Sequence, residues 1–323
     1  MPFENGKKEK LLALLIVVLL FFFISILLFS ISLNNKNRTE ALKKAVEKIQ
    51  LDREVKEKLD KIHLIATTSP EVTAKSYLTL ALNSNGEGKI LAVKEADLSL
   101  PIASVTKLMV AVVTLENLRL DTDVTATRDY IGREESAFVL ETNKVYKVQD
   151  LLANALISSD NDSARLLSST LGENNFIAKM NSKAKSLGMA STTFFSPTGL
   201  DPTGLPGGTL GVNVSTATDL AKLLLYIKNH HPEIFRITTN SVFNFCDISN
   251  YCKVVTNTDK LLQEKGLKYD IIGGKTGSTD LALKNLVLLT DMGNNVTLIN
   301  VVLGARDSFV DTTSLINNVI MDK

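Results

Sequence analysis

Hydrophobic and polar positions divide the chain into an apolar run, a polar segment and a long mixed region. No charged residue occurs from Leu11 to Leu33. As a helix this run would span about 34 Å, which suits a hydrocarbon core about 30 Å thick. A cleavable signal peptide has a shorter apolar core, of about 7–15 residues, and no clear cleavage site is visible here. We therefore predict a single transmembrane anchor at 11–33, preceded by a cytoplasmic tail at 1–10.

The next segment, residues 34–64, is polar and rich in charge, with apolar residues at roughly helical spacing. This pattern favours an amphipathic helical stalk, although it is too short to establish a coiled coil. The sequence "ATTSPE" then breaks the helical pattern. We place a stalk and linker at 34–75 and a globular domain at 76–323. The apolar positions of the stalk are Leu42, Ala45, Val46, Ile49, Leu59 and Ile62.

The pattern of the globular part predicts strands at both ends and helices between them. "SYLTLAL" and "KILAVK" are typical of strands, as are "IIGGKTGS", "NLVLLTD" and "VTLINVVLGA" near the C-terminus. We expect an α+β fold in which one antiparallel sheet joins the first and last strands, with helices on its faces. Helices are predicted at 104–117, 148–157, 163–171, 174–187, 216–228 and, at the end, 311–321.

Charge and cysteine content narrow the classes of partner. With 36 basic and 35 acidic residues the chain is nearly neutral, so a nucleic-acid partner has no electrostatic support. Lysines flank the apolar run on both sides, so flanking charge does not define its orientation. Cys246 and Cys252 flank turn-forming residues in "FCDISNYC", and the sequence leaves open whether they form a hairpin disulfide. No further cysteine completes a ligand set, and we predict neither a metal nor a cofactor.

The stretch "LPIASVTKLMV" places a lysine inside an apolar helical pattern. Ser104 and Lys107 are three residues apart, so on a helix they lie on one face and can touch. The simplest interpretation is a capping serine and a lysine whose ammonium reaches solvent. The alternative is a nucleophile and its base, which requires the lysine to be neutral.

A serine nucleophile in this chain needs a base other than histidine. His63 belongs to the stalk, and His230 and His231 precede Pro232, where capping of a helix C-terminus explains them. No G-x-S-x-G motif is present, which argues against a Ser–His–Asp triad. Burial and a second nearby cation both lower a lysine pKa from its usual value of about 10.4. Lys275, in "GGKTGST", is the candidate for that second cation.

Two further motifs, together with Ser104 and Lys107, complete a set of three. Ser159, Asp160 and Asn161 lie in a polar break between two apolar helical runs, and a helix cap would also explain them. "KTGS", from Lys275 to Ser278, lies on a predicted strand and is alternatively a solvated strand end with a bulge glycine. S-x-x-K, S-x-N and K-T-G in this order are typical of penicillin-binding proteins and class A β-lactamases.

With these motifs in place, residues 75–323 resemble the serine D-Ala-D-Ala carboxypeptidases, the low-molecular-mass penicillin-binding proteins. The resemblance extends beyond the motifs, to "VQDLLANALISSDNDSARLL", "FIAKMNSKAKSLGMASTTFFSPTGLD" and "VVTNTDKLL". It implies the penicillin-binding-protein/β-lactamase transpeptidase fold. It also implies that Ser104 is acylated, that Lys107 accepts its proton and that Ser159 relays a proton to the leaving D-alanine. The substrate-binding residues that it implies are Asn161, Lys275, Thr276, Gly277 and Ser278.

Two positions depart from the family pattern. Ala282 is followed by Leu283 where the family often has glycine, and Arg306 is displaced from the position of an arginine that helps to bind the substrate carboxylate. The resemblance implies stem peptides ending in D-Ala-D-Ala as substrate and β-lactam antibiotics as covalent inhibitors. The domain is expected outside the cytoplasm, on a protein anchored in the cell membrane through 11–33.

Three alternatives to a D,D-carboxypeptidase stay open at this point. A D,D-endopeptidase acting on peptidoglycan cross-links would use the same residues. A class A-like β-lactamase would need a glutamate to activate the deacylating water, and Glu173, Glu233 and Glu264 are poorly placed in the sequence for that task. The third alternative is a non-catalytic scaffold that binds muropeptides.

Overall fold

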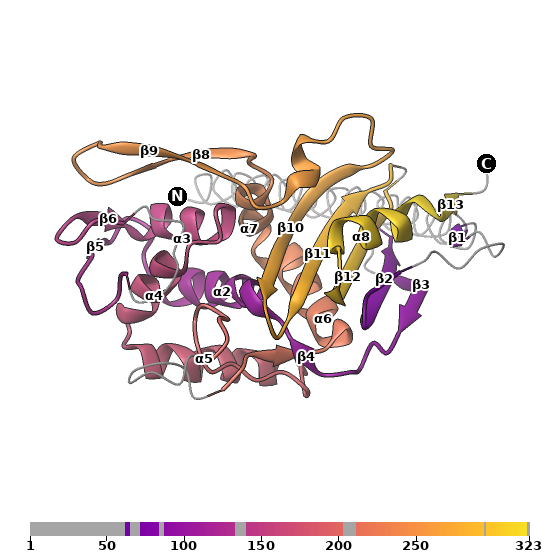
Figure 1. The fold of residues 1–323 in the computed structure, drawn as a ribbon, viewed down its shortest axis with the longest axis horizontal. Coiled ribbons are helices and arrows are strands. Elements are labelled where there is room, and N and C mark those ends of the chain that lie inside the picture. Colours follow the sequence, from indigo (N-terminus) through magenta and orange to yellow (C-terminus); the bar gives the residue numbers. More distant parts are fainter. Residues whose placement is uncertain are drawn as a thin grey trace, which may run out of the picture. The chain divides into compact units, whose positions relative to one another are not determined.

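The structure, a computed structural model, describes residues 62–64, 72–83, 87–132, 140–202, 211–293 and 295–321 (Figure 1). The predicted tail, the anchor at 11–33 and most of the stalk lie outside these residues. Within the described ranges, no helix is both long enough and apolar enough to cross a bilayer.

A five-stranded antiparallel sheet joins the two ends of the domain, in the order β10-β11-β12-β2-β3. Strand β12 pairs with β2, so the first and last strands meet as predicted. The expected α+β architecture of an antiparallel sheet with helices is therefore confirmed. The strands are β2 (Ser76–Leu82), β3 (Gly88–Lys94), β10 (Asp270–Thr279), β11 (Leu283–Asp291) and β12 (Thr297–Ala305).

Both faces of the central strands are covered. Along β11, Val287 and Leu289 pack with the large helical core, whereas Leu286 and Leu288 pack on the opposite side with Ile316. Strands buried on both faces are expected to be apolar at successive positions, which explains the continuous apolar runs near the C-terminus. Ile316 belongs to α8 (Ser308–Asn317), which covers that opposite face.

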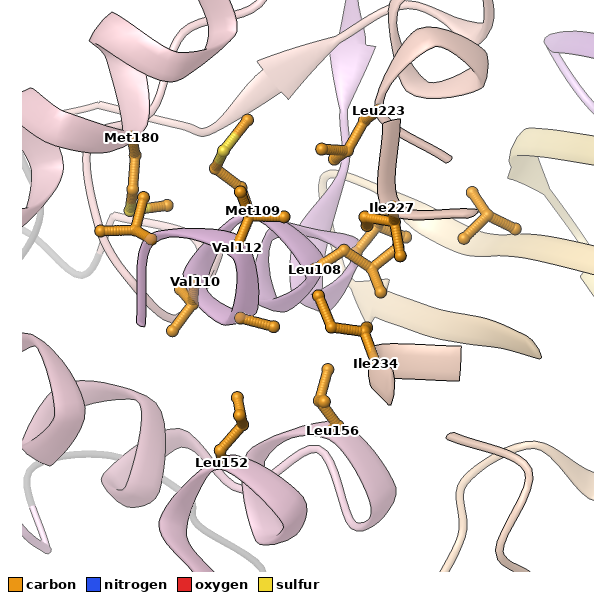
Figure 2. Packing of buried hydrophobic residues seen from close by; sticks show 14 of the residues in the cluster. Leu108, Met109, Val110, Val112, Leu152, Leu156, Met180, Leu223, Ile227 and Ile234 are labelled. Carbon is orange, nitrogen blue, oxygen red and sulfur yellow. The ribbon is translucent and has the colours of Figure 1, made fainter. Parts of the chain in front are cut away.

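Helix α2 (Lys107–Asn117) is the centre of the helical layer, and its first eight residues are buried. It follows a 3₁₀ turn, η1 (Ala103–Thr106), that carries Ser104. The surrounding helices are α3 (Val148–Ile157), α4 (Asn161–Ser169), α5 (Glu173–Ser186), α6 (Ala217–His230) and α7 (Pro232–Thr238). Figure 2 shows Leu108, Met109, Val110 and Val112 of α2 among Leu152, Leu156, Met180, Leu223, Ile227 and Ile234 of its neighbours.

Short two-stranded antiparallel sheets complete the fold. Cys246 lies directly opposite Cys252 in the hairpin of β8 and β9, and the two form a disulfide, which the sequence left open. A short 3₁₀ helix, η2 (Lys260–Gln263), leads from this hairpin to β10. These two-stranded sheets pair β4 (Leu100–Pro101) with β7 (Val214–Ser215), β5 (Asp123–Thr125) with β6 (Val145–Lys147), and β8 (Val242–Cys246) with β9 (Cys252–Thr256).

The prediction of a terminal helix at 311–321 is wrong at both ends. The helix begins at Ser308, because the Asp307 side chain accepts hydrogen bonds from the backbone N–H groups of Phe309 and Val310 and caps it. After Asn317 the chain forms β13 (Val319–Met321), which pairs with β1 (Ile62–Leu64). The end of the predicted helical stalk is therefore a strand, since a distant pairing partner overrides the local helical period.

Candidate active site

The segment that carries Ser104 is held between two glycines. At Gly277 of β10, a Cβ atom would lie 2.7 Å from the Ile102 carbonyl oxygen and 3.2 Å from the Ser104 nitrogen. At Gly199, a Cβ atom would collide with the Ala103 carbonyl oxygen. Both glycines therefore allow backbone to approach backbone at the serine. The alternative of a bulge glycine in "KTGS" is wrong, because the register shift in β10 lies at Ile271/Gly273.

Lys107 is fully buried beside Ser104. Its Nζ donates to Ser104 Oγ at 2.8 Å, to Asn161 Oδ1 at 2.8 Å and to the Thr198 carbonyl oxygen at 3.1 Å. The interpretation of a lysine reaching solvent is therefore wrong. The S-x-x-K spacing brings the amine to the hydroxyl, although through a 3₁₀ turn and the start of α2 rather than one continuous α-helix.

The polar break between α3 and α4 serves as a cap and also supplies two site residues. Asp160 is the N-cap of α4, and its side chain accepts from the Ser163 backbone N–H at 2.6 Å. Ser159, immediately before it, has a φ of 63°, a left-handed conformation that is uncommon outside glycine. This turn brings the side chain of Ser159 to Lys275 and that of Asn161 to Lys107. The cap interpretation is correct for Asp160, and the flanking residues face the site.

Lys275 is the second buried lysine of the site, with 2% of its surface exposed. Its Nζ donates to Ser159 Oγ at 2.9 Å and to the Thr276 carbonyl oxygen at 3.1 Å. Burial lowers the pKa of Lys275 well below its usual value, and repulsion from Lys107 lowers it further, against a smaller opposing effect of Asp259. The predicted proximity of a second cation to Lys107 is confirmed.

Asp259 is a buried carboxylate beside this lysine that sequence reasoning missed. Its Oδ1 accepts from the Leu261 backbone N–H at 3.0 Å, at the start of η2. Burial raises its pKa to about 6, although that hydrogen bond and the charge of Lys275 favour the ionised form. Asp259 lies in the stretch "VVTNTDKLL", whose resemblance to the family is the signal in the sequence that could have suggested it.

A cavity of about 350 Å³ opens beside the serine. Within it, Thr258 Oγ1 and Thr276 Oγ1 lie 2.5 Å apart, and Lys284 Nζ donates to Ser278 Oγ at 2.9 Å. All eight motif residues thus lie in or directly behind one cavity, whereas the sequence did not indicate Thr258 or Lys284. The residues lining the cavity are Ser104, Ser159, Thr258, Lys260, Thr276, Gly277, Ser278, Lys284, Asn285, Arg306, Asp307, Ser308 and Phe309.

The histidines near the α6–α7 junction are outside this cavity. His230 Nδ1 lies 3.1 Å from the Tyr226 carbonyl oxygen, as expected for a residue that caps a helix C-terminus. His231 is the C-cap residue of α6, with its backbone N–H donating to the Ile227 carbonyl oxygen at 2.9 Å. Its ring nitrogens lie 3.3 Å from Glu116 Oε1 and 3.4 Å from Glu233 Oε1. Neither ring lines the cavity, so neither is placed to serve Ser104 as a base.

One departure from the family pattern, at Leu283, lies in the turn between β10 and β11. Leu283 has a φ of 58°, the left-handed conformation that favours glycine. A leucine in this conformation costs about 1–2 kcal/mol. The Asp201 carboxylate stabilises the same turn. It accepts hydrogen bonds from Thr279 Oγ1 at 2.8 Å and from the Leu281 backbone N–H at 2.9 Å.

Comparison with known proteins finds similar sequences over most of the chain. The model of the D-alanyl-D-alanine carboxypeptidase family (peptidase family S11) matches residues 64–307. A D-alanyl-D-alanine endopeptidase of Escherichia coli is 34% identical over 77% of this chain and 79% of its own. A D-alanyl-D-alanine carboxypeptidase of Mycobacterium tuberculosis is 33% identical over 68% of this chain and 70% of its own.

Solved structures give the same result. Penicillin-binding protein D2 of Listeria monocytogenes, in its ampicillin-bound form, superposes with a TM-score of 0.66 at 29% identity, covering 78% of this chain and 99% of that one. A D-alanyl-D-alanine carboxypeptidase structure from Mycobacterium tuberculosis gives a TM-score of 0.68 at 28% identity, covering 79% and 94%. The fold of the described domain is that of these proteins.

Proposed function

Since the chain belongs to the D-alanyl-D-alanine carboxypeptidase family of serine hydrolases, we propose that it removes the terminal D-alanine from peptidoglycan stem peptides through an acyl-enzyme at Ser104. The observation that carries this proposal is the 2.8 Å hydrogen bond between the buried Lys107 amine and the Ser104 hydroxyl. It joins a nucleophile to the group that can activate it.

In the acylation step, Ser104 Oγ attacks the carbonyl carbon of the penultimate D-alanine and transfers its proton to Lys107 Nζ. Two conditions favour a neutral amine at Lys107, namely full burial and a second lysine close by. The oxyanion is assigned to the backbone N–H groups of Ser104 and Ser278, because Gly277 brings β10 against the serine. Asn161 is assigned to the substrate amide.

Collapse of the tetrahedral intermediate breaks the C–N bond, and Ser159 relays to the departing nitrogen the proton that Lys107 accepted from Ser104. The hydrogen bond from Lys275 to Ser159 supports this role, because it orients the hydroxyl toward the cavity. Lys275, Thr276 and Ser278 bind the terminal carboxylate of the substrate. Water then attacks the ester carbonyl, releasing the shortened peptide and restoring the Ser104 hydroxyl.

The alternative enzymes differ from a D,D-carboxypeptidase in the leaving group or in how the acyl-enzyme ester is hydrolysed. An endopeptidase acting on cross-links would use the same residues, and one relative carries that name. Against a β-lactamase, Glu173, Glu233 and Glu264 are all absent from the residues lining the cavity with Ser104. Against a scaffold, the motif side chains form the hydrogen bonds that catalysis requires. β-Lactams are proposed to acylate Ser104 as slowly released inhibitors, and one structural relative holds ampicillin.

The substrate of this reaction lies outside the cytoplasmic membrane, so we place the domain there, on a single-pass anchor at 11–33. The support for the anchor is the uncharged apolar run itself. The support for the outer location is the chemistry of the substrate, since flanking lysines occur on both sides of the run.

The test of the proposed function is release of D-alanine from diacetyl-L-lysyl-D-alanyl-D-alanine. The wild-type protein should release it, and Ser104→Ala should abolish release. Lys107→Ala should fold and react about 10²–10⁴-fold more slowly, the usual contribution of a general base. Near-normal turnover by Lys107→Ala would remove this residue from the role of base, and the absence of D-alanine release by the wild type would contradict the proposal.

A further inference from the structure

The leaving group of the proposed reaction must occupy the cavity. Ser104 and Ser159 both line it, whereas Lys107 and Asn161 lie behind the nucleophile and do not. Because Ser159 is assigned to protonate the departing nitrogen, the departing amine lies on this side of the ester. At about 350 Å³ the cavity falls in the range of sites that hold drug-sized ligands, which is more space than D-alanine fills.

Three cationic side chains from three separate elements converge on this cavity. Lys260 comes from η2, Lys284 from β11, and Arg306 from the segment that precedes α8. Lys284 is tied to the K-T-G strand through its 2.9 Å hydrogen bond to Ser278 Oγ. The lining also contains one carboxylate, Asp307, whose Oδ1 accepts from two backbone N–H groups at the start of α8.

These three cations share one cavity lining and, among the residues that the structure describes, have no acidic partner. Across the described ranges, neither Lys260, Lys284 nor Arg306 forms an ion pair with a carboxylate. Unpaired cations that share a cavity attract an anion from solution. Elsewhere five lysines have carboxylate partners at 2.7–3.0 Å, in the pairs Lys144–Asp247, Lys147–Asp123, Lys183–Glu116, Lys222–Asp219 and Lys253–Glu141.

A single carboxylate on the leaving group does not account for this much positive charge. The carboxylate of D-alanine is already assigned to Thr276, Ser278 and Lys275. We propose that the cavity selects leaving amines that carry a second carboxylate, and that Lys260, Lys284 and Arg306 bind it. The chemical class is an acidic D-amino acid, or an acidic peptide, joined through its amine to D-alanine. This inference rests on the proposed function, because it assumes that Ser104 is acylated and that an amine departs.

The test compares two peptides that differ only in the second carboxylate. Both begin with diacetyl-L-lysyl-D-alanine, one ends in D-glutamate and the other in D-glutamine, which has the same shape without the charge. The measurement is kcat/KM at low salt, from the amount of D-amino acid released. We expect D-glutamate to be favoured by about fivefold, the upper range for exposed charge pairs. Added salt should reduce this preference, because the three side chains are exposed.

Variants of the lining residues test whether the cavity causes the preference for D-glutamate over D-glutamine. Lys284→Met and Arg306→Leu should each lower the ratio of D-glutamate to D-glutamine turnover about two- to fivefold. Lys265→Met is the matched control, because this exposed lysine lies close to η2 without lining the cavity, and it should leave the ratio unchanged.

Equal turnover of the two peptides by the wild type would overturn the inference, as would a ratio that Lys284→Met and Arg306→Leu leave unchanged. In either case release of D-alanine from the D-Ala-D-Ala peptide would leave the proposed function intact. If none of the three peptides were hydrolysed, the proposed function itself would fail, and the inference with it.

Discussion

Three buried titratable groups, Lys107, Lys275 and Asp259, lie together behind the candidate nucleophile. Each is at most 4% exposed, so each interacts through protein rather than through water. Asp259 is the acidic member of the group, and it favours the protonated form of Lys275. The Tyr269 phenol is also affected by its charge. Asp259 therefore balances part of the positive charge that the chemistry requires at this site.

The raised pKa of Asp259 predicts a pH-dependent stability. Its carboxyl has a pKa of about 6 in the folded protein, against an ordinary value of 3.8, so between these values the folded protein binds more protons than the unfolded chain. The free energy of unfolding should therefore fall as pH rises through this window. Asp259→Asn keeps an acceptor for the Leu261 N–H and should remove this slope, gaining about 3 kcal/mol at pH 7.

Urea unfolding at pH 4, 5, 6 and 7 would measure this difference. Asp270→Asn is the matched control, since Asp270 is an exposed carboxylate at the start of the same strand, β10. A slope that persists unchanged in Asp259→Asn would show that another group is responsible.

Two pairs of motif residues could be predicted to lie together because each pair is close in the sequence. Ser104 with Lys107, and Ser159 with Asn161, are each held within a single turn, so the sequence places them together directly. Thr198 contributes only its backbone carbonyl, which any residue type could supply, and so leaves no sequence signal. Lys284 reaches the site because β11 turns back on β10 and pairs Lys284 with Ser278. This position can be assigned only once the register of the two strands is known.

At the scale of elements, the β8–β9 hairpin is held by several local interactions. Its disulfide joins directly opposed residues, and the Phe245 ring stacks on Tyr146 with 5.0 Å between centroids. In the connecting turn, Asp247 accepts from the Ser249 and Tyr251 backbone N–H groups at 2.8 and 3.0 Å. Hydrogen bonds from the Ser249 hydroxyl and from Lys144 hold the pKa of Asp247 well below its usual range.

Removal of the disulfide should destabilise the domain modestly. A cross-link between cysteines six residues apart closes a short loop, for which loop entropy predicts about 2 kcal/mol. The Cys246→Ala/Cys252→Ala double variant should therefore unfold at lower urea concentration. Acylation by penicillin should be unchanged, because no hairpin residue lines the cavity.

Thiol labelling of the purified protein without reductant provides the complementary measurement. Unlabelled cysteines would agree with the disulfide, and full labelling of both would contradict it. Equal urea midpoints for the wild type and the double variant would contradict the loop-entropy argument.

At the scale of the whole molecule, the order of the central strands follows from the sequence, whereas the last pairing does not. Strands at both ends with helices between them required the termini of the domain to meet, as β2 and β12 do. The β1–β13 pair joins short segments at opposite ends of the domain, and each fits a helical period as well as a strand. Each segment forms a strand because the other segment is present to pair with it.

The proposed location makes a prediction for the whole protein. With an anchor at 11–33 and the domain outside, protease added to intact spheroplasts should digest a C-terminally tagged protein, and the tag should be found in the membrane fraction before digestion. Full protection of the tag would contradict this topology. A cytoplasmic protein followed in the same sample is the control for spheroplast integrity.

The central claim is that Ser104 forms an acyl-enzyme whose hydrolysis suits a peptide and not a penicillin. The most direct measurement follows two quantities in one preparation, the mass of the protein after penicillin addition and the D-alanine released from a D-Ala-D-Ala peptide. We predict a long-lived penicilloyl adduct on the tryptic peptide that contains Ser104, no adduct in Ser104→Ala, and release of D-alanine by the untreated protein. Rapid multiple-turnover hydrolysis of penicillin with no release of D-alanine would contradict this account.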